Sequence, residues 1–196
     1  MDHQKNIRSF LDEQKKCLSN ILKDTSEIDQ VVNHLIKIRN QKKTIFTMGN
    51  GGSASTASHF VSDILKTCIT KNNNRFQATS LVDNIPVILA WSNDVSYESI
   101  FLEQLKNSLK KNDVVIGFSG SGNSTNILNA LRYAKKNNAF CIGFTGESGG
   151  KMKNLCDICI RVPSNEMLSI ESQHVILCHC IANCIRHSGI PLFKYD

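Results

Sequence analysis

Two amphipathic segments open the chain. From Asp2 to about Lys23, and again from Ser26 to about Arg39, apolar residues recur at helical spacing and polar residues fill the opposite side. Neither segment can bury its apolar stripe alone. We therefore expect residues 1–42 to form a helical extension whose two helices pack on the rest of the chain or on another subunit.

The pattern changes in residues 43–196, where short apolar segments alternate with helical ones. Strands that are apolar along their whole length, separated by helices, indicate a parallel sheet covered on both faces. We predict a three-layer αβα sandwich of about five parallel strands, doubly wound and flavodoxin-like, which forms a single domain with the extension. The expected strands are 44–48, 77–81, 113–118, 139–144 and 157–162. The expected helices are 53–66, 97–110, a segment ending near 137, and 168–187, with an apolar segment at 85–91.

The composition fits one globular domain. The chain has 196 residues, of which 41% are hydrophobic and 20% charged, enough for a sizeable core. No apolar run reaches the roughly 18–20 residues that cross a membrane, and the first twelve residues, which are mostly polar, lack the continuous apolar segment of a signal peptide. Because eight cysteines in such a chain suit a reducing compartment, we expect a cytoplasmic protein without membrane association.

The cysteine spacing partly matches a four-cysteine zinc site. Residues 157–161, however, are expected to form a buried strand, with no turn that could fold the first pair around a metal. We therefore expect cysteines that are buried and pack as small hydrophobic residues. The cysteines concerned are Cys156, Cys159, Cys178, Cys180 and Cys184.

The formal net charge of +6 suggests an anionic ligand or a nucleic acid. The lysines, however, are spread over the predicted helices, in pairs such as Lys15-Lys16 and Lys110-Lys111. We therefore expect solvated helix surfaces and no direct binding of nucleic acid.

Two loops follow predicted strands, at the edge of the sheet where ligands of such folds bind. The loop Ser119-Gly120-Ser121-Gly122-Asn123-Ser124 offers three hydroxyls and backbone N–H groups where a helix begins, which favours an anion. Because it lacks Lys, Arg and the P-loop pattern, it suits a sugar phosphate better than a nucleoside triphosphate. The alternative is an ordinary turn in which Ser121 or Asn123 caps the helix.

The other loop, Gly49-Asn50-Gly51-Gly52-Ser53, also has an alternative interpretation. With Ala54 it satisfies the dinucleotide fingerprint G-x-G-x-x-G/A after a strand. The acidic residue expected about 20 positions later is missing, since Asp83 lies too far along the chain. A dinucleotide site therefore remains the weaker alternative.

Both loops, taken together with His59, Asn93-Asp94 and Gly149-Gly150-Lys151, resemble the SIS (sugar isomerase) domain, and more closely the phosphoheptose isomerases. The similarity covers nearly the whole chain. It implies a homotetrameric enzyme that interconverts sedoheptulose 7-phosphate and D-glycero-D-manno-heptose 7-phosphate, for heptose, lipopolysaccharide or capsule precursors. The substrate-binding residues that it implies are Asn50, Gly51, Gly52, Ser53, Asn93, Asp94, Ser119, Gly120, Ser121, Asn123, Ser124 and Glu171.

The resemblance also implies a set of catalytic and metal-binding residues. Asp63 and His179 correspond to the family's base and acid, and zinc would be held by His59, Asp63, Glu171 and His179. Carboxylates and imidazoles suit both proton transfer and zinc. Asp63 stands where the family has Glu and Glu171 where it has Gln, while Gly120 and Leu168 replace polar residues. In addition, Glu171 and His179 are about 12 Å apart along a helix, which is long for a shared metal.

The final helix is apolar on nearly every side, so we expect it to be buried all round, as part of a core between subunits. Two alternative functions remain: a non-catalytic SIS adaptor that binds the DnaA replication initiator, suggested by the altered Asp63 and Glu171, and an isomerase or binder for another ketose phosphate.

Overall fold

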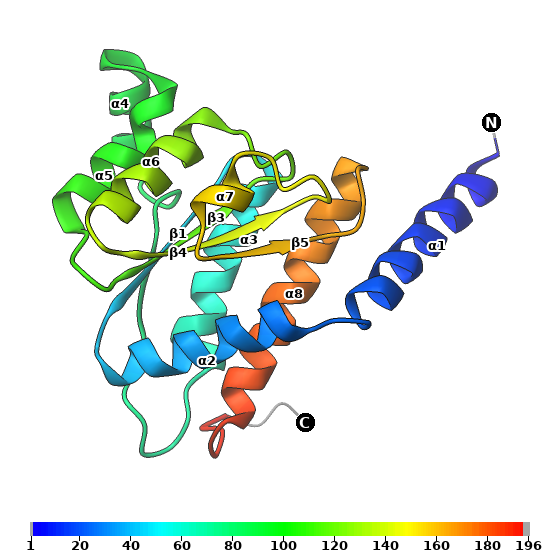
Figure 1. The fold of residues 1–196 in the computed structure, drawn as a ribbon, viewed down its shortest axis with the longest axis horizontal. Helices are drawn as coiled ribbons and strands as arrows, with labels where there is room; N and C mark the ends of the chain where they lie inside the picture. Colours follow the sequence, from blue (N-terminus) through cyan, green and yellow to red (C-terminus); the bar gives the residue numbers. More distant parts are fainter. Residues whose placement is uncertain (1, 194–196) are drawn as a thin grey trace.

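The computed structural model describes residues 2–193 and contains one sheet of five parallel strands in the order β2-β1-β3-β4-β5. Figure 1 shows the sheet at the centre of the molecule, between two layers of helices. The predicted αβα sandwich is therefore confirmed. The strands are β1 (Thr44–Gly49), β2 (Gln77–Ser80), β3 (Val114–Phe118), β4 (Phe140–Thr145) and β5 (Ile158–Arg161).

Two separate cores lie on the two faces of the sheet. Successive strand residues point to opposite faces; in β3, Val114 and Ile116 join one core while Val115 joins the other. The first core packs against α1, α2, α3 and α8, and the second against α5, α6 and α7. The helices are α1 (His3–Ile21), α2 (Ser26–Asn40), α3 (Gly52–Ser62), α4 (Ile85–Asp94), α5 (Ile100–Ser108), α6 (Thr125–Lys136), α7 (Met152–Leu155) and α8 (Met167–His187).

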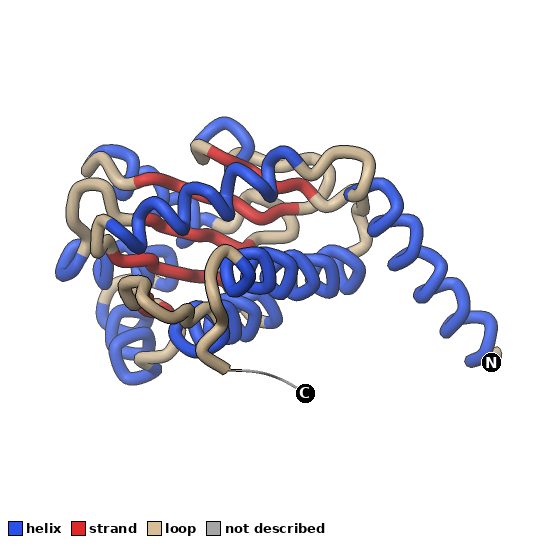
Figure 2. Tube along the Cα trace, turned by 90° about the horizontal axis from the view of Figure 1, so that it is seen from below, coloured by secondary structure: helices blue, strands red, loops and turns tan. Residues whose placement is uncertain are grey.

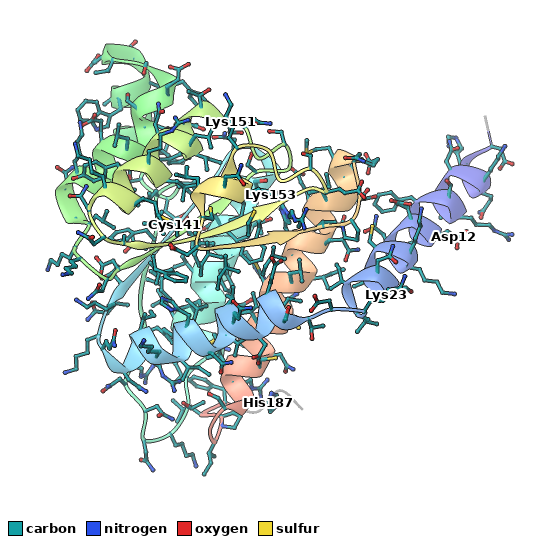
Figure 3. All side chains as sticks on the ribbon, in the orientation of Figure 1. Asp12, Lys23, Cys141, Lys151, Lys153 and His187 are labelled. Carbon is teal, nitrogen blue, oxygen red and sulfur yellow. The ribbon has the colours of Figure 1, made fainter. Side chains whose placement is uncertain are left out.

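The two N-terminal helices differ in how they are covered. In α2 the whole predicted apolar face is buried, from Ile28 to Ile38. Helix α1 projects from the body, as Figures 1 and 2 show, and only Cys17 within it is buried. Asp12 lies out along this arm, away from the sheet, and Lys23 lies where the arm joins the body (Figure 3). Most of the predicted apolar stripe is exposed, namely Ile7, Phe10, Leu11 and Leu18 of α1 and Leu22 directly after it.

Several expectations need correction. The predicted helix 53–66 is divided, because a π-helix, η1 (Asp63–Thr67), follows α3. A 3-10 turn, η2 (Tyr97–Ser99), likewise precedes α5. The apolar segment 85–91 belongs to α4.

Among the helices of residues 2–193, none combines the length and the hydropathy that crossing a membrane requires.

In the single chain the last helix is buried on one side only, so its expected burial in a core between subunits stays a prediction. One side of α8 packs on the sheet and on α3, whereas the side carrying Leu168, Ile176, Cys180 and Cys184 is exposed. Cys180 and Cys184 therefore do not pack as buried hydrophobic residues, although Cys159 and Cys178 do. The apolar pattern predicts a covered surface but does not say whether the same chain or another subunit covers it.

Candidate active site

The order of the strands places the two predicted loops side by side. Strands β1 and β3 are neighbours at the point where the strand order reverses, and their carboxyl ends carry the loops 49–53 and 119–124. In doubly wound sheets of this order, ligands bind at that switch point.

Three ionisable side chains converge between α3 and α8. His59 lies on α3, Asp63 begins the π-helix η1, and His179 lies on α8. The Nε2 atoms of His59 and His179 are 2.7 Å apart, and Asp63 Oδ2 lies 3.5 Å and 3.7 Å from them respectively. The structure thus brings together three of the four predicted metal ligands, including both predicted acid–base residues.

Burial divides these three side chains. About half of each imidazole is exposed, 47% for His59 and 56% for His179, whereas the Asp63 side chain is only 14% exposed. Asp63 Oδ1 accepts a hydrogen bond from Thr67, but the buried Oδ2 has no hydrogen-bond partner in the described residues. A buried carboxylate oxygen without a donor is costly. A ligand bound at this site, either a substrate hydroxyl or a cation, would therefore supply the missing partner of Asp63 Oδ2.

Glu171 lies apart from this cluster. Its carboxylate abuts the backbone at the start of α3, so closely that a side chain at Gly52 would collide with it. Glu171 and His59 line the same open groove, of about 590 Å³, which Phe10 of α1 also borders. Across the described residues, the group of side chains near enough to share a metal is His59, Asp63 and His179, without Glu171.

In the loop of residues 119–124, called the serine loop from here on, the predicted hydroxyls lie close together. Ser119 Oγ lies 3.1 Å from Ser124 Oγ and 3.5 Å from Ser121 Oγ. Ser124 is the N-cap of α6 in backbone position, yet its side chain makes no capping hydrogen bond within the described chain. The capping alternative for Ser121 or Asn123 is therefore wrong. Because Ser124 lies at the start of α6, this cluster of hydroxyls lies beside a helix N-terminus, an arrangement that favours an anion.

The loop of residues 146–151, between β4 and α7, contacts the serine loop and holds its shape. Asn123 Oδ1 accepts the backbone N–H of Lys151, and its amide nitrogen donates to Ser121 O. Gly122 and Gly149, both at positive φ, approach so closely that a side chain on Gly122 would collide with the Gly149 carbonyl. Asn123, predicted to bind substrate, therefore serves here to fix the shape of the loop.

The loop of residues 49–53 is joined to α6 by two hydrogen bonds between amide side chains, which the sequence did not predict. Asn50 and Asn126 donate to each other, at 3.0 Å and 2.9 Å, and the Tyr97 hydroxyl donates to Asn50 Oδ1 at 2.8 Å. Gly51, at φ 55°, then turns the chain into α3, leaving Ser53 buried. The Asn50 oxygen is therefore occupied, and the group it offers a substrate is its remaining amide N–H. The sequence signal for Asn126 was weak: one buried polar residue in the first turn of a helix.

Asn93 and Asp94 are not among the side chains that converge at His59, Asp63 and His179. They end α4 rather than capping a following helix, both are exposed, and Asn93 donates to Asp94 at 2.8 Å. Their predicted contact with substrate stays a prediction.

His174, the other histidine in this stretch of α8, is fully buried. It lies against the rings of Phe118 and Phe144, with Nε2 3.3 Å from the Thr145 carbonyl. Burial lowers its pKa from 6.5 to about 4. It is a neutral packing residue at neutral pH.

Comparison with known proteins agrees with this geometry. Residues 9–146 match the model of the SIS domain family. A phosphoheptose isomerase of Helicobacter pylori is 37% identical over 175 residues, which are 88% of this chain and 91% of that protein. One from Burkholderia pseudomallei is 32% identical over 185 residues, 93% of each chain. The chain therefore belongs to the SIS domain family, in its phosphoheptose isomerase branch.

Solved structures resemble the whole fold. A phosphoheptose isomerase from Francisella tularensis has a TM-score of 0.89 at 26% identity, covering 95% of this chain and all of that one. One from Neisseria gonorrhoeae has a TM-score of 0.86 at 26% identity, covering 94% and 98%. These similarities favour a sugar-phosphate site over the dinucleotide alternative.

Proposed function

We propose that this chain interconverts sedoheptulose 7-phosphate and D-glycero-D-manno-heptose 7-phosphate. The observation that carries the proposal is the convergence of His59, Asp63 and His179 between α3, which follows β1, and α8. A loop of hydroxyls suited to a phosphate ends the neighbouring strand. The phosphoheptose isomerases among the relatives support the same pair of sugars.

The reaction moves one proton from C1 to C2 and shifts the carbonyl from C2 to C1. In our proposal Asp63 takes the C1 proton as the base and returns it at C2. His179 donates a proton to the carbonyl oxygen on C2 and accepts the hydroxyl proton of O1, so both groups end as they began. The hydroxyls of Ser119, Ser121 and Ser124 hold the phosphate, with the N-terminal end of α6 behind them.

Zinc is part of the proposal as a cofactor. Two imidazole nitrogens and a buried carboxylate oxygen without a hydrogen-bond donor are donors that zinc accepts. When zinc is bound, His59, Asp63 and His179 would hold it, and the ion would polarise the substrate oxygens as a Lewis acid in place of the proton donated by His179. Glu171 lies outside this group, so its role as a fourth ligand stays a prediction.

The test is incubation of the purified chain with sedoheptulose 7-phosphate, followed by NMR. Three samples are compared: the protein as purified, after chelation, and after chelation and return of zinc. We expect the aldose product, with turnover lowered by chelation and restored by zinc. Absence of aldose in all three samples would refute the proposal, and faster turnover of another ketose phosphate would favour that alternative.

The adaptor alternative has less support, because three converging ionisable groups have no evident use in a protein that only binds DnaA. Recovery of DnaA in a pull-down, together with absent turnover, would reverse this ranking.

We also propose that the chain works as a cytoplasmic homotetramer that supplies heptose precursors. The eight free cysteines suit a reducing compartment. The exposed apolar residues of α1 and α8 form surfaces of the kind that another subunit buries. Light scattering should give the mass of four 21.9 kDa chains, whereas the mass of a single chain would contradict this assembly.

A further inference from the structure

The helix that carries His59 changes type at Asp63. The π-helix η1 spans Asp63–Thr67, and the Asp63 carbonyl accepts the N–H of Cys68, five residues on, at 2.9 Å. The Cys68 thiol then donates to the Ala182 carbonyl of α8 at 3.6 Å. Single π-turns are rare and occur often at functional sites. This one fixes the segment after Asp63 against the helix that carries His179.

Within this turn, Thr67 holds the Asp63 carboxylate. Thr67 Oγ1 donates to Asp63 Oδ1 at 3.1 Å, while Oδ2 faces the two imidazoles at 3.5 Å and 3.7 Å. Holding one carboxylate oxygen sets the rotation of the whole group and therefore the direction of the other oxygen. Since threonine is branched at Cβ, its own hydroxyl has few alternative positions.

The other groups near Asp63 do not do this work. Cys68 and Cys178 are buried thiols close to the carboxylate. Burial, with the charge of Asp63 nearby, raises the pKa of Cys68 to about 12, so that it stays neutral. Among the hydrogen bonds of the described residues, the one that reaches the Asp63 carboxylate comes from Thr67.

We propose that Thr67 is the positioning residue of Asp63. This inference rests on the proposed function, in which Oδ2 transfers protons or binds zinc. Aspartate is one methylene shorter than the glutamate that the family resemblance implies at this position, so its reach leaves less room for error. A misplacement of about 1 Å can cost about 10² in rate. The hydroxyl of Thr67 removes that error by fixing the carboxylate toward His59 and His179.

The test compares three variants with the wild-type chain. Thr67→Val keeps the shape and removes the hydroxyl, Thr67→Ser keeps the hydroxyl, and Thr44→Val removes a hydroxyl from the opposite end of the sheet. The measurements are kcat and KM for sedoheptulose 7-phosphate, the melting temperature, and zinc affinity by competition with a chromophoric chelator.

We expect Thr67→Val to lower kcat by about 10- to 100-fold, with KM changed less than about threefold, and to lower zinc affinity by about tenfold. Thr67→Ser should restore most of each loss, and Thr44→Val should behave like the wild type. A Thr67→Val chain with wild-type kcat and zinc affinity would overturn the inference. So would equal losses in Thr67→Val and Thr67→Ser that follow the melting temperature, because these would indicate a purely structural role.

Failure of the proposed function gives a different pattern. If the wild-type chain turns over no sedoheptulose 7-phosphate, the proposed function fails, and zinc affinity alone decides the role of Thr67. Weaker zinc binding by Thr67→Val than by Thr67→Ser would then still support positioning. Equal binding by the two variants, or no zinc binding by the wild type, would overturn it.

Discussion

Helix α8 carries two histidines, five residues apart, in opposite surroundings. His174 faces the sheet and is fully buried, with Nε2 3.3 Å from the Thr145 carbonyl. His179 faces α3, is 56% exposed, and meets His59 and Asp63. Burial lowers the pKa of His174 to about 4, so this histidine is uncharged near neutral pH.

The difference shows what separates a packing histidine from a site histidine. Each is a single imidazole on the same helix, and apolar residues follow each one in the sequence. What differs is the partner: a backbone carbonyl inside the core for His174, and two ionisable side chains between α3 and α8 for His179. The two histidines should therefore respond differently to substitution and to pH.

The largest effect should come from removing His179. We expect His179→Ala to lower kcat about 10³-fold with little change in melting temperature, because the residue takes part in proton transfer and is half exposed. Turnover of sedoheptulose 7-phosphate measures this. The control is His187→Ala, a substitution at the far end of α8 (Figure 3), which should keep wild-type turnover. Equal rates for His179→Ala and the control would remove the distinction between the two sides of α8.

The next effect concerns stability, and it belongs to His174. Its folded pKa of about 4 lies below the ordinary value of 6.5, so between these values the unfolded chain binds more protons. Its contribution to stability is therefore complete above about pH 6.5 and is lost as the pH falls toward 4. At about 1.4 kcal/mol per pH unit, the loss should approach about 3 kcal/mol.

Urea unfolding of the wild type and of His174→Gln at pH 7 and pH 4.5 checks this. The variant should be less stable at pH 7 but lose less on acidification, since glutamine does not titrate. The same pH slope in both chains would show that other groups govern the acid sensitivity.

A smaller effect is expected at two helix N-caps, where one residue stabilises its helix and the other is proposed to contact the substrate. Ser124 precedes α6 without a side-chain capping bond, whereas the Asn84 side chain accepts the Val87 N–H in α4. We expect Ser124→Ala to raise KM about tenfold, through one lost hydrogen bond to a charged phosphate, with nearly unchanged stability. Asn84→Ala should cost about 1 kcal/mol of stability and leave KM unchanged. If Ser124→Ala instead loses stability and keeps its KM, Ser124 is a structural cap.

Much of the fold followed from the sequence, because its signals are local. The apolar strands, the face of α2 and the two glycine-containing loops each depend on neighbouring residues. The π-turn at Asp63 did not follow, since it depends on how Cys68 meets Ala182 across 114 residues. The exposure of α1 could not be predicted either, because an amphipathic pattern predicts an apolar face without saying which surface covers it.

The site was predictable as a set of residues but not as a geometry. His59 and Asp63 share a helix face by their spacing, whereas the approach of His179 required the packing of α8 on α3. The pairing of Asn50 with Asn126, and the position of Glu171 against Gly52 rather than beside His179, also arise from tertiary contacts.

The most direct test of the central claim is the rate at which wild-type and Asp63→Asn chains form the aldose from sedoheptulose 7-phosphate, followed side by side by NMR. Asparagine keeps the size of the side chain and can still accept from Thr67, but it cannot act as the base. We predict aldose formation by the wild type and a rate at least about 10² lower for Asp63→Asn. Equal rates for the two chains would contradict the assignment of this cluster as the active site.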